Sequence, residues 1–145
     1  ALGVRTPLVA DAADETALRD ALDAAARDLG EPDIVVYNAA AIRPDAIGEL
    51  SHRDHTDAYT VNVLGALTAA AHTLPGMARR GRGGTFVVTG GMPEMKPQYV
   101  SLSLGKAGGV RAWSNSSTRS TGPRACTSPP SPWAVVAPGT AHDPR

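Results

Sequence analysis

The sequence holds little that would tie it to a membrane, a disulfide framework or a polyanion. Cys126 is the single cysteine, so the chain can form neither an intrachain disulfide nor a cysteine metal site. Its 14 basic and 14 acidic residues cancel, which leaves no electrostatic footprint for nucleic acid or an anionic membrane. The apolar runs fall far short of the roughly 18 residues of a membrane helix, and no signal segment opens the chain. We therefore expect one domain of 145 residues in the cytoplasm.

A second absence concerns the binding of phosphates and metals. No G-x-x-x-G-x-G or G-x-G-x-x-G pattern occurs in the sequence. Such a glycine turn presents backbone amides at a helix N-terminus to the pyrophosphate of a dinucleotide. His52 and His55 could share one helix face, but no further ligand is evident beside them. The sequence thus predicts no metal site and lacks the usual pyrophosphate cradle.

The first third of the chain has a strand–helix–strand pattern. The stretch TPLVAD (residues 6–11) is typical of a short buried strand. Asp14 can cap a helix whose C-terminal end is marked by Gly30. The run DIVVYNAA (33–40) does not alternate, as in a strand that is covered on both faces. The short links predict a parallel sheet with a right-handed crossover.

A long helix is predicted to follow, from Ser51, with Asp54 as its capping-box partner. Pro75 should kink this helix or end a segment of it. A strand at 85–89 and a helix after Pro97 that carries Lys106 complete the pattern. The long helix is expected to bury a stripe made of Val61, Leu64, Leu67, Ala71 and Leu74.

The composition changes abruptly between residues 113 and 134. This segment has no Val, Ile, Leu, Met, Phe or acidic residue, so it should not order by itself. Codons can be chosen so that WSNSSTRSTGP (113–123), read one nucleotide earlier, becomes LVELLDEEYGP, an amphipathic helix. The same offset turns residues 124–134 into a strand-like string. We therefore hypothesise a double frameshift, with a natural low-complexity loop as the alternative. The gene sequence decides, because the true DNA must encode an apolar helix and strand at that offset.

Short motifs occur in a characteristic order along the chain. They are Asp11-Ala12, VYNAA (36–40), NVLG (62–65), GGTFVVTGG (83–91), SLSLGKAGGVRA (101–112) and APG (137–139). This order resembles the short-chain dehydrogenase/reductase family over roughly residues 9–112 and again from 135. The resemblance implies an α/β fold with an incomplete Rossmann-like, doubly wound parallel sheet that lacks the first βαβ unit. Residues 1–112 would form the partial domain, 113–134 an irregular segment, and 135–145 a turn and tail.

The resemblance also implies a reaction and its residues. In the family, a nicotinamide delivers hydride to a carbonyl while a tyrosine phenol supplies the proton. The residues at the matching positions are Lys106, which would tune the phenol and hold the ribose, Thr89, which would bind the carbonyl oxygen, and Asn62, which would steady a water chain. Taken alone, these residues could also be a surface lysine, a strand-end threonine and a core amide.

Further positions match the part of the family that contacts NAD or NADP. Asp11 stands where an aspartate contacts the adenine, although a strand-end cap explains it equally well. Asn38, Ala39 and Ala40 match a segment that lies against the cofactor. Pro138 and Gly139 match a turn beside the nicotinamide, and Lys106 would hold the ribose.

One position departs from the family in its chemistry. The tyrosine should stand four residues before Lys106, and this chain has Leu102 there. An alkyl group donates no proton. Tyr99 lies seven residues before the lysine, about 10 Å along a helix, and is better explained by packing at the helix entry. The hydroxyls of Ser101 and Ser103 have a pKa poorly matched to the task.

Three functions remain open from the sequence. The first is an NAD- or NADP-dependent oxidoreductase of doubtful activity, acting on a small carbonyl or alcohol substrate. The second is a non-catalytic relative that senses the cofactor or pairs subunits, and the third is an inactive fragment. The resemblance implies a homodimer or homotetramer that pairs through the helices at 51–80 and 98–112.

Overall fold

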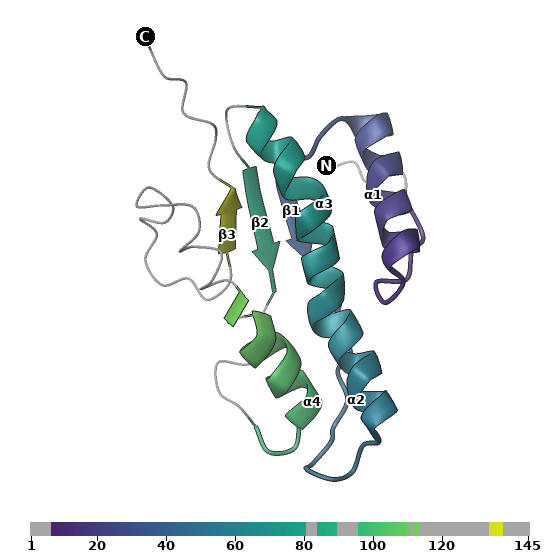
Figure 1. Cartoon of the computed structure of the whole chain (residues 1–145), viewed down its shortest axis with the longest axis vertical. Helices are drawn as coiled ribbons and strands as arrows, with labels where there is room; N and C mark the ends of the chain where they lie inside the picture. The colour runs from purple at the N-terminus through teal and green to yellow at the C-terminus, as the bar shows by residue number, and fades with distance from the viewer. Residues whose placement is uncertain (1–6, 81–83, 90–95, 111, 114–133, 138–145) are drawn as a thin grey trace, which may run out of the picture.

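The computed structural model describes residues 7–80, 84–89, 96–110 and 112–113, together with the backbone of 134–137. Figure 1 shows a small sheet crossed by one long helix, with a second helix packed beside it. The elements in chain order are α1 (Glu15–Leu29), β1 (Ile34–Tyr37), α2 (His52–Tyr59), η1 (Thr60–Leu64), α3 (Gly65–Arg79), β2 (Gly84–Val88), α4 (Val100–Leu102), η2 (Ser103–Gly109) and β3 (Ala134–Ala137). The segments η1 and η2 are π-helical.

The sheet has the order β1-β2-β3. β1 and β2 are parallel, with Ile34 opposite Thr85 and Tyr37 opposite Val88. This confirms the predicted α/β fold with parallel strands. β3 runs antiparallel to β2, so the sheet is mixed. The strand β3 begins at Ala134, the last residue of the segment expected to be irregular. The helical segment between β2 and β3 in the chain, α4 with η2, is therefore not the crossover of a parallel pair.

The predicted helix ends are confirmed. The Asp14 side chain caps α1 by accepting hydrogen bonds from the backbone N–H groups of Thr16 and Ala17. Gly30 ends α1 with a φ of 85°, a conformation that suits glycine. Ser51 caps α2, and Asp54 completes the reciprocal capping box. These contacts are local, which is why the sequence reveals them.

The buried face of the long helix differs from the prediction. Leu64 and Ala71 are exposed, whereas the deeply buried positions are mostly small residues. The buried positions keep a helical spacing but lie on a different face from the predicted stripe, a face lined by small residues that let the helix approach its neighbours closely, as Gly65 approaches Tyr37 and Ala12. The helix also continues through Pro75 to Arg79, so the proline does not end it. The buried positions are Ala58, Asn62, Val63, Gly65, Ala66, Ala69, Ala70, Thr73, Gly76 and Met77.

Two predictions about the N-terminal strands are wrong in this structure. Residues 7–10 form no strand, and Val9 is fully exposed, at 101% of its reference surface. β1 is not covered on both faces, because Ile34 and Val36 are 64% and 58% exposed. Among the described residues, β1 pairs only with β2, and its main helix contacts come from α3. In the part of the chain that the structure describes, no strand pairs with the outer edge of β1, and two of its four side chains stay at the surface.

The core lies between the sheet and α3. Tyr37, Phe86, Val88 and Val110 pack there against three alanines of α3. The ring of Trp113 meets Phe86 edge-to-face, with the ring centroids 6.3 Å apart. Val110 anchors the end of η2 in this cluster, which ties the Lys106 helix to the sheet. Within the described ranges, every helix is too short or too polar to cross a bilayer.

Candidate functional site

The carboxyl ends of β1 and β2 lie side by side because the two strands are parallel and in register. The backbone N–H of Thr89 donates to the carbonyl oxygen of Tyr37 over 3.1 Å. The Thr89 hydroxyl donates to the Asn38 side-chain oxygen over 2.6 Å. In open parallel sheets, ligands bind at this edge. Two of the residues predicted from the sequence, Asn38 and Thr89, therefore meet where a ligand would be expected.

Lys106 reaches the same edge from η2. Its ammonium donates to the Thr89 carbonyl oxygen over 2.9 Å and lies 3.3 Å from the Thr89 hydroxyl. It also lies 5.7 Å from the centre of the Tyr37 ring, in cation–π range. The residue is only 3% exposed, and this burial lowers the pKa of the Lys106 amine below its usual value of 10.5. Lys106 is therefore not a solvated surface lysine.

Asn62 is fully buried at the centre of η1. Its side-chain oxygen accepts from the backbone N–H of Ala41 over 2.9 Å, and its amide donates to the Ala41 carbonyl over 3.3 Å. The η2 helix approaches it closely, because a Cβ at Gly105 would lie 3.0 Å from the Asn62 Cβ. The structure thus places Asn62 against Ala41, in the loop after Asn38, and against Gly105, the residue before Lys106.

Tyr37 is a part of this site that the sequence did not single out. Its hydroxyl donates to the Val61 carbonyl oxygen over 2.5 Å, and burial, helped by the negative charge of Asp11, raises the pKa of Tyr37 to about 12. A phenol held in this way is a poor proton donor near neutral pH. The signal available in the sequence was that a tyrosine stands at the first position of the 37–40 motif.

Leu102 and its neighbours lie at the position where the family has its proton donor. Leu102 is buried, four residues and about one helical turn before Lys106. Tyr99 precedes α4 and is not part of the helix. Ser101 is bonded to Asp45, and the buried Ser103 hydroxyl has no hydrogen-bond partner among the described residues. An alkyl group thus occupies the position from which an acid would act beside the ammonium.

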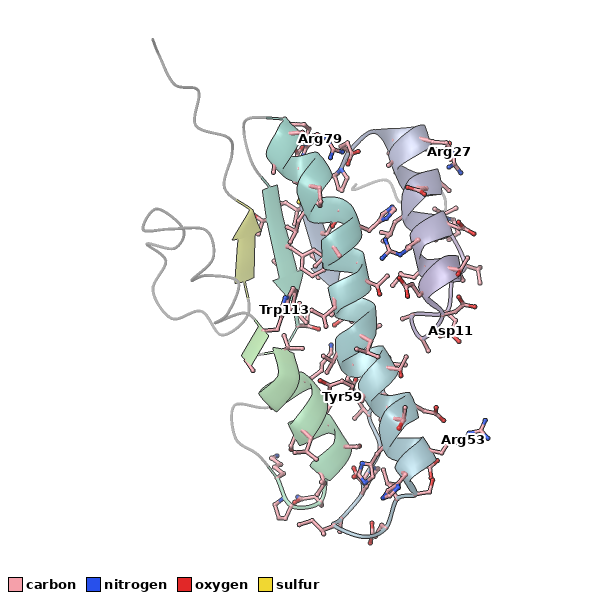
Figure 2. The ribbon with its side chains drawn as sticks, in the orientation of Figure 1. Asp11, Arg27, Arg53, Tyr59, Arg79 and Trp113 are labelled. Atoms are coloured by element: carbon pink, nitrogen blue, oxygen red, sulfur yellow. The ribbon has the colours of Figure 1, made fainter. Side chains whose placement is uncertain are left out.

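The other predicted cofactor residues are less directly placed. Asp11 is exposed in the turn before α1, as Figure 2 shows, and its carboxylate accepts from the N–H of Ala13 over 2.8 Å. This is the geometry of a local cap. Ala39 and Ala40 are half-buried in the segment that follows β1. Pro138 and Gly139 lie outside the described residues.

The site fits one end of a dinucleotide better than the other. A buried ammonium and a hydroxyl at the strand ends suit the hydroxyls of a ribose and a carbonyl oxygen. A pyrophosphate needs a helix N-terminus free of negative charge. The start of α1 carries Asp11, Asp14 and Glu15, which would repel phosphate. In the described part of the chain, no three His, Cys, Asp or Glu residues gather into a group that could bind a metal.

Comparisons of the sequence with protein families and with known proteins both match dehydrogenases. The family model for short chain dehydrogenase matches residues 4–110. Mouse (Mus musculus) 17-beta-hydroxysteroid dehydrogenase 13 is 30% identical over 109 residues, which are 72% of this chain and 36% of that protein.

Two solved structures share the fold. An alcohol dehydrogenase from the archaeon Thermococcus sibiricus, complexed with 5-hydroxy-NADP, has a TM-score of 0.68 and 21% identity over 77% of this chain and 47% of its own. LigO from Sphingobium sp. strain SYK-6, in its apo form, has a TM-score of 0.70 and 26% identity over 76% of this chain and 41% of its own. The chain thus spans between 36% and 47% of the lengths of these relatives.

Proposed function

Because this chain belongs to the short-chain dehydrogenase family, we propose that it binds NAD or NADP at the carboxyl ends of β1 and β2. The reaction class is hydride transfer between a nicotinamide and a small carbonyl or alcohol. Turnover is slow, because Leu102 stands where a proton donor is needed. The observation that carries the proposal is the buried Lys106 ammonium bonded to Thr89 at the strand end. The Thermococcus relative, which was solved with a form of NADP, supports the choice of cofactor class.

Each site residue has a distinct part in this proposal. The Lys106 ammonium would bind ribose hydroxyls and hold the ring end of the cofactor, which supplies the hydride. The Thr89 hydroxyl, now turned to Asn38, would donate instead to the carbonyl oxygen of the substrate. Asn38 would then be free to position a second hydroxyl or amide. Tyr37 cannot take the role of the acid, because its hydroxyl is bonded to Val61 and its pKa is raised to about 12.

The two lysines of the chain allow a matched test of cofactor binding. Lys96 is exposed, whereas Lys106 is buried in the site. We expect NADH or NADPH to shift the thermal transition of the parent chain and of a Lys96→Met variant. Lys106→Met should bind roughly 10- to 150-fold more weakly, which corresponds to the loss of a charged hydrogen bond.

The measurement is a fluorescence and thermal-shift titration with each nucleotide. If the parent chain responds to neither nucleotide at millimolar concentration, the proposed cofactor is wrong. If both lysine variants weaken binding equally, the cofactor does not bind at the Thr89–Lys106 edge.

An alternative function is that of a subunit-pairing or cofactor-sensing protein without catalysis. Tyr59 and Leu64 on the long helix and Leu104 on η2 are large apolar side chains that remain exposed. Figure 2 shows Tyr59 on the side of the long helix nearest α4, and a Cβ at Gly109 would lie 3.5 Å from its hydroxyl. Pairing of two copies through these helices would cover the apolar side chains. A dimer that binds the nucleotide yet reduces no carbonyl would favour this alternative.

A further inference from the structure

Asp45 is a buried carboxylate that the proposed mechanism does not use. It lies in the loop between β1 and α2 and is only 1% exposed. One carboxylate oxygen accepts from the backbone N–H of Ser101 and the other from the Ser101 hydroxyl, each over 2.9 Å. Its own N–H donates to the Gln98 carbonyl, and its carbonyl accepts from the N–H of Val100. One residue thus binds both the backbone and a side chain at the start of the Lys106 helix.

The start of that helix has few other partners. Tyr99, at the N-cap position of α4, provides no side-chain hydrogen bond. The first N–H groups of any helix need acceptors from outside the helix. Here Asp45 accepts two of them, those of Val100 and Ser101, and places negative charge at the helix end where it is favourable. A buried carboxylate is costly unless it is hydrogen-bonded in this way. The four contacts therefore explain why the charge can be buried and what it holds in place.

The geometry of this helix depends strongly on tertiary contacts. Only three residues of α4 are α-helical, and the seven residues of η2 that carry Lys106 are π-helical. The π-helix is rare and is found mostly as single turns, often at functional sites. Its register is set here by contacts at both ends, Asp45 at the start and the Lys106–Thr89 bond with Val110 at the other. Freeing one end should let the helix rotate or slide.

The loop that carries Asp45 also links the two π-helical segments. The side-chain amide of Asn62 in η1 forms hydrogen bonds with both the backbone N–H and the backbone carbonyl of Ala41. Ala41 lies four residues before Asp45. Residues 41–45 therefore connect the centre of η1 to the start of α4. Gly105 lets the two segments approach closely at Asn62, in the turn that precedes Lys106.

We propose that Asp45 is a positioning residue for Lys106. It anchors the start of α4 so that η2 delivers the ammonium to Thr89 at the end of β2. The consequence for nucleotide binding rests on the proposed function above, but the placement of the lysine does not.

The test compares the reactivity of the two lysines in the native state. Trace acetylation with acetic anhydride is followed by mass spectrometry, well below each variant's thermal transition, and exposed Lys96 serves as the internal reference. We expect the Lys106-to-Lys96 labelling ratio to rise about 10- to 100-fold in Asp45→Ala, as an anchor to a charged group is lost. Asp45→Asn keeps an acceptor oxygen and should rescue part of the protection. Ser101→Ala removes one of the two side-chain bonds and should give an intermediate rise.

A destabilising variant at the opposite end of β1 provides the control. Arg80 donates to the carbonyl oxygens of Glu31 and Pro32, so Arg80→Ala should weaken the fold without exposing Lys106. If Asp45→Ala does not fold, Asp45→Asn and Ser101→Ala carry the test. An unchanged ratio in the folded Asp45 and Ser101 variants, or an equal rise in Arg80→Ala, overturns the proposal.

Titration of the same variants with NADH and NADPH separates the two proposals. If Asp45→Ala exposes Lys106 but the parent chain binds neither nucleotide, the positioning role stands and the proposed function fails. If the parent chain binds a nucleotide and the labelling ratio does not change in Asp45→Ala, the proposed function stands and the positioning role of Asp45 fails. When both hold, the dissociation constant rises in Asp45→Ala and recovers partly in Asp45→Asn.

Discussion

Replacing Leu102 with tyrosine is expected to raise the rate of NADH- or NADPH-dependent carbonyl reduction about 10²- to 10⁴-fold, the usual contribution of a positioned general acid. Position 102 lies four residues before Lys106 on the same helix, so a phenol there would reach the region of the ammonium. The nearby positive charge favours the phenolate and lowers the phenol pKa towards neutral pH. The site already holds the lysine and the hydroxyl of Thr89, and the variant adds the proton donor that they lack.

The control for this variant is Leu102→Phe. Leu102 is buried, so either aromatic ring adds volume to a packed region and carries a similar packing cost. The two variants differ only in the phenol oxygen. The rates of nucleotide oxidation are compared across several small ketones and aldehydes at a range of pH values. Equal rates in the tyrosine and phenylalanine variants would show that position 102 does not face the reacting carbonyl.

Replacing Gly65 with alanine is expected to lower the free energy of unfolding by about 1–3 kcal/mol, the usual cost of overpacking a core. A Cβ at this position would meet the Tyr37 hydroxyl and lie 2.5 Å from the backbone carbonyl oxygen of Ala12. Neither neighbour can easily move, because the hydroxyl is bonded to Val61 and the carbonyl belongs to the main chain. The steric clash therefore outweighs the gain in helix propensity that alanine normally brings.

Gly76 of the same helix provides the matched control. A Cβ there would also be too close to a neighbour, but that neighbour is the carboxylate of Glu31 at the end of a flexible, exposed side chain. The carboxylate can move into solvent, so Gly76→Ala should be neutral or should stabilise the chain by up to about 1 kcal/mol. Urea and thermal unfolding of both variants measure the difference. Similar losses in the two variants would mean that Tyr37 and the turn at Ala12 are not tightly packed against the helix.

Much of the local structure could be predicted from the sequence. Asp14, Gly30, Ser51 and Asp54 each act on backbone groups within a few residues, so their roles appear in the order of residues alone. The strands β1 and β2 were predicted at residues 33–40 and 85–89, but the parallel pairing was predicted for 33–40 with residues 6–11, whereas the structure pairs β1 with β2. The order of the short motifs along the chain also indicates the correct family.

The burial pattern could not be predicted in the same way. The buried face of the long helix is lined mostly by alanine and glycine, whereas the sequence pattern favoured the face that carries its leucines. The exposed side chains of Ile34 and Val36 depend on which layers and strands surround β1, and a run of β-branched residues does not carry that information.

For the candidate site, the sequence by itself determined which chemical groups are present, an amine, a hydroxyl and two amides, and that a leucine replaces the acid. The tertiary structure decided how they are arranged. It turned the lysine inward onto Thr89, bonded Asn62 to Ala41, brought Tyr37 beneath the ammonium and made Asp45 the anchor of the Lys106 helix. The reason is physical. A helix cap is a contact within one turn of the chain, whereas the hydrogen bonds of Lys106, Asn62 and Asp45 join residues 17 to 56 positions apart. Such contacts exist only once the apolar core has brought the segments together.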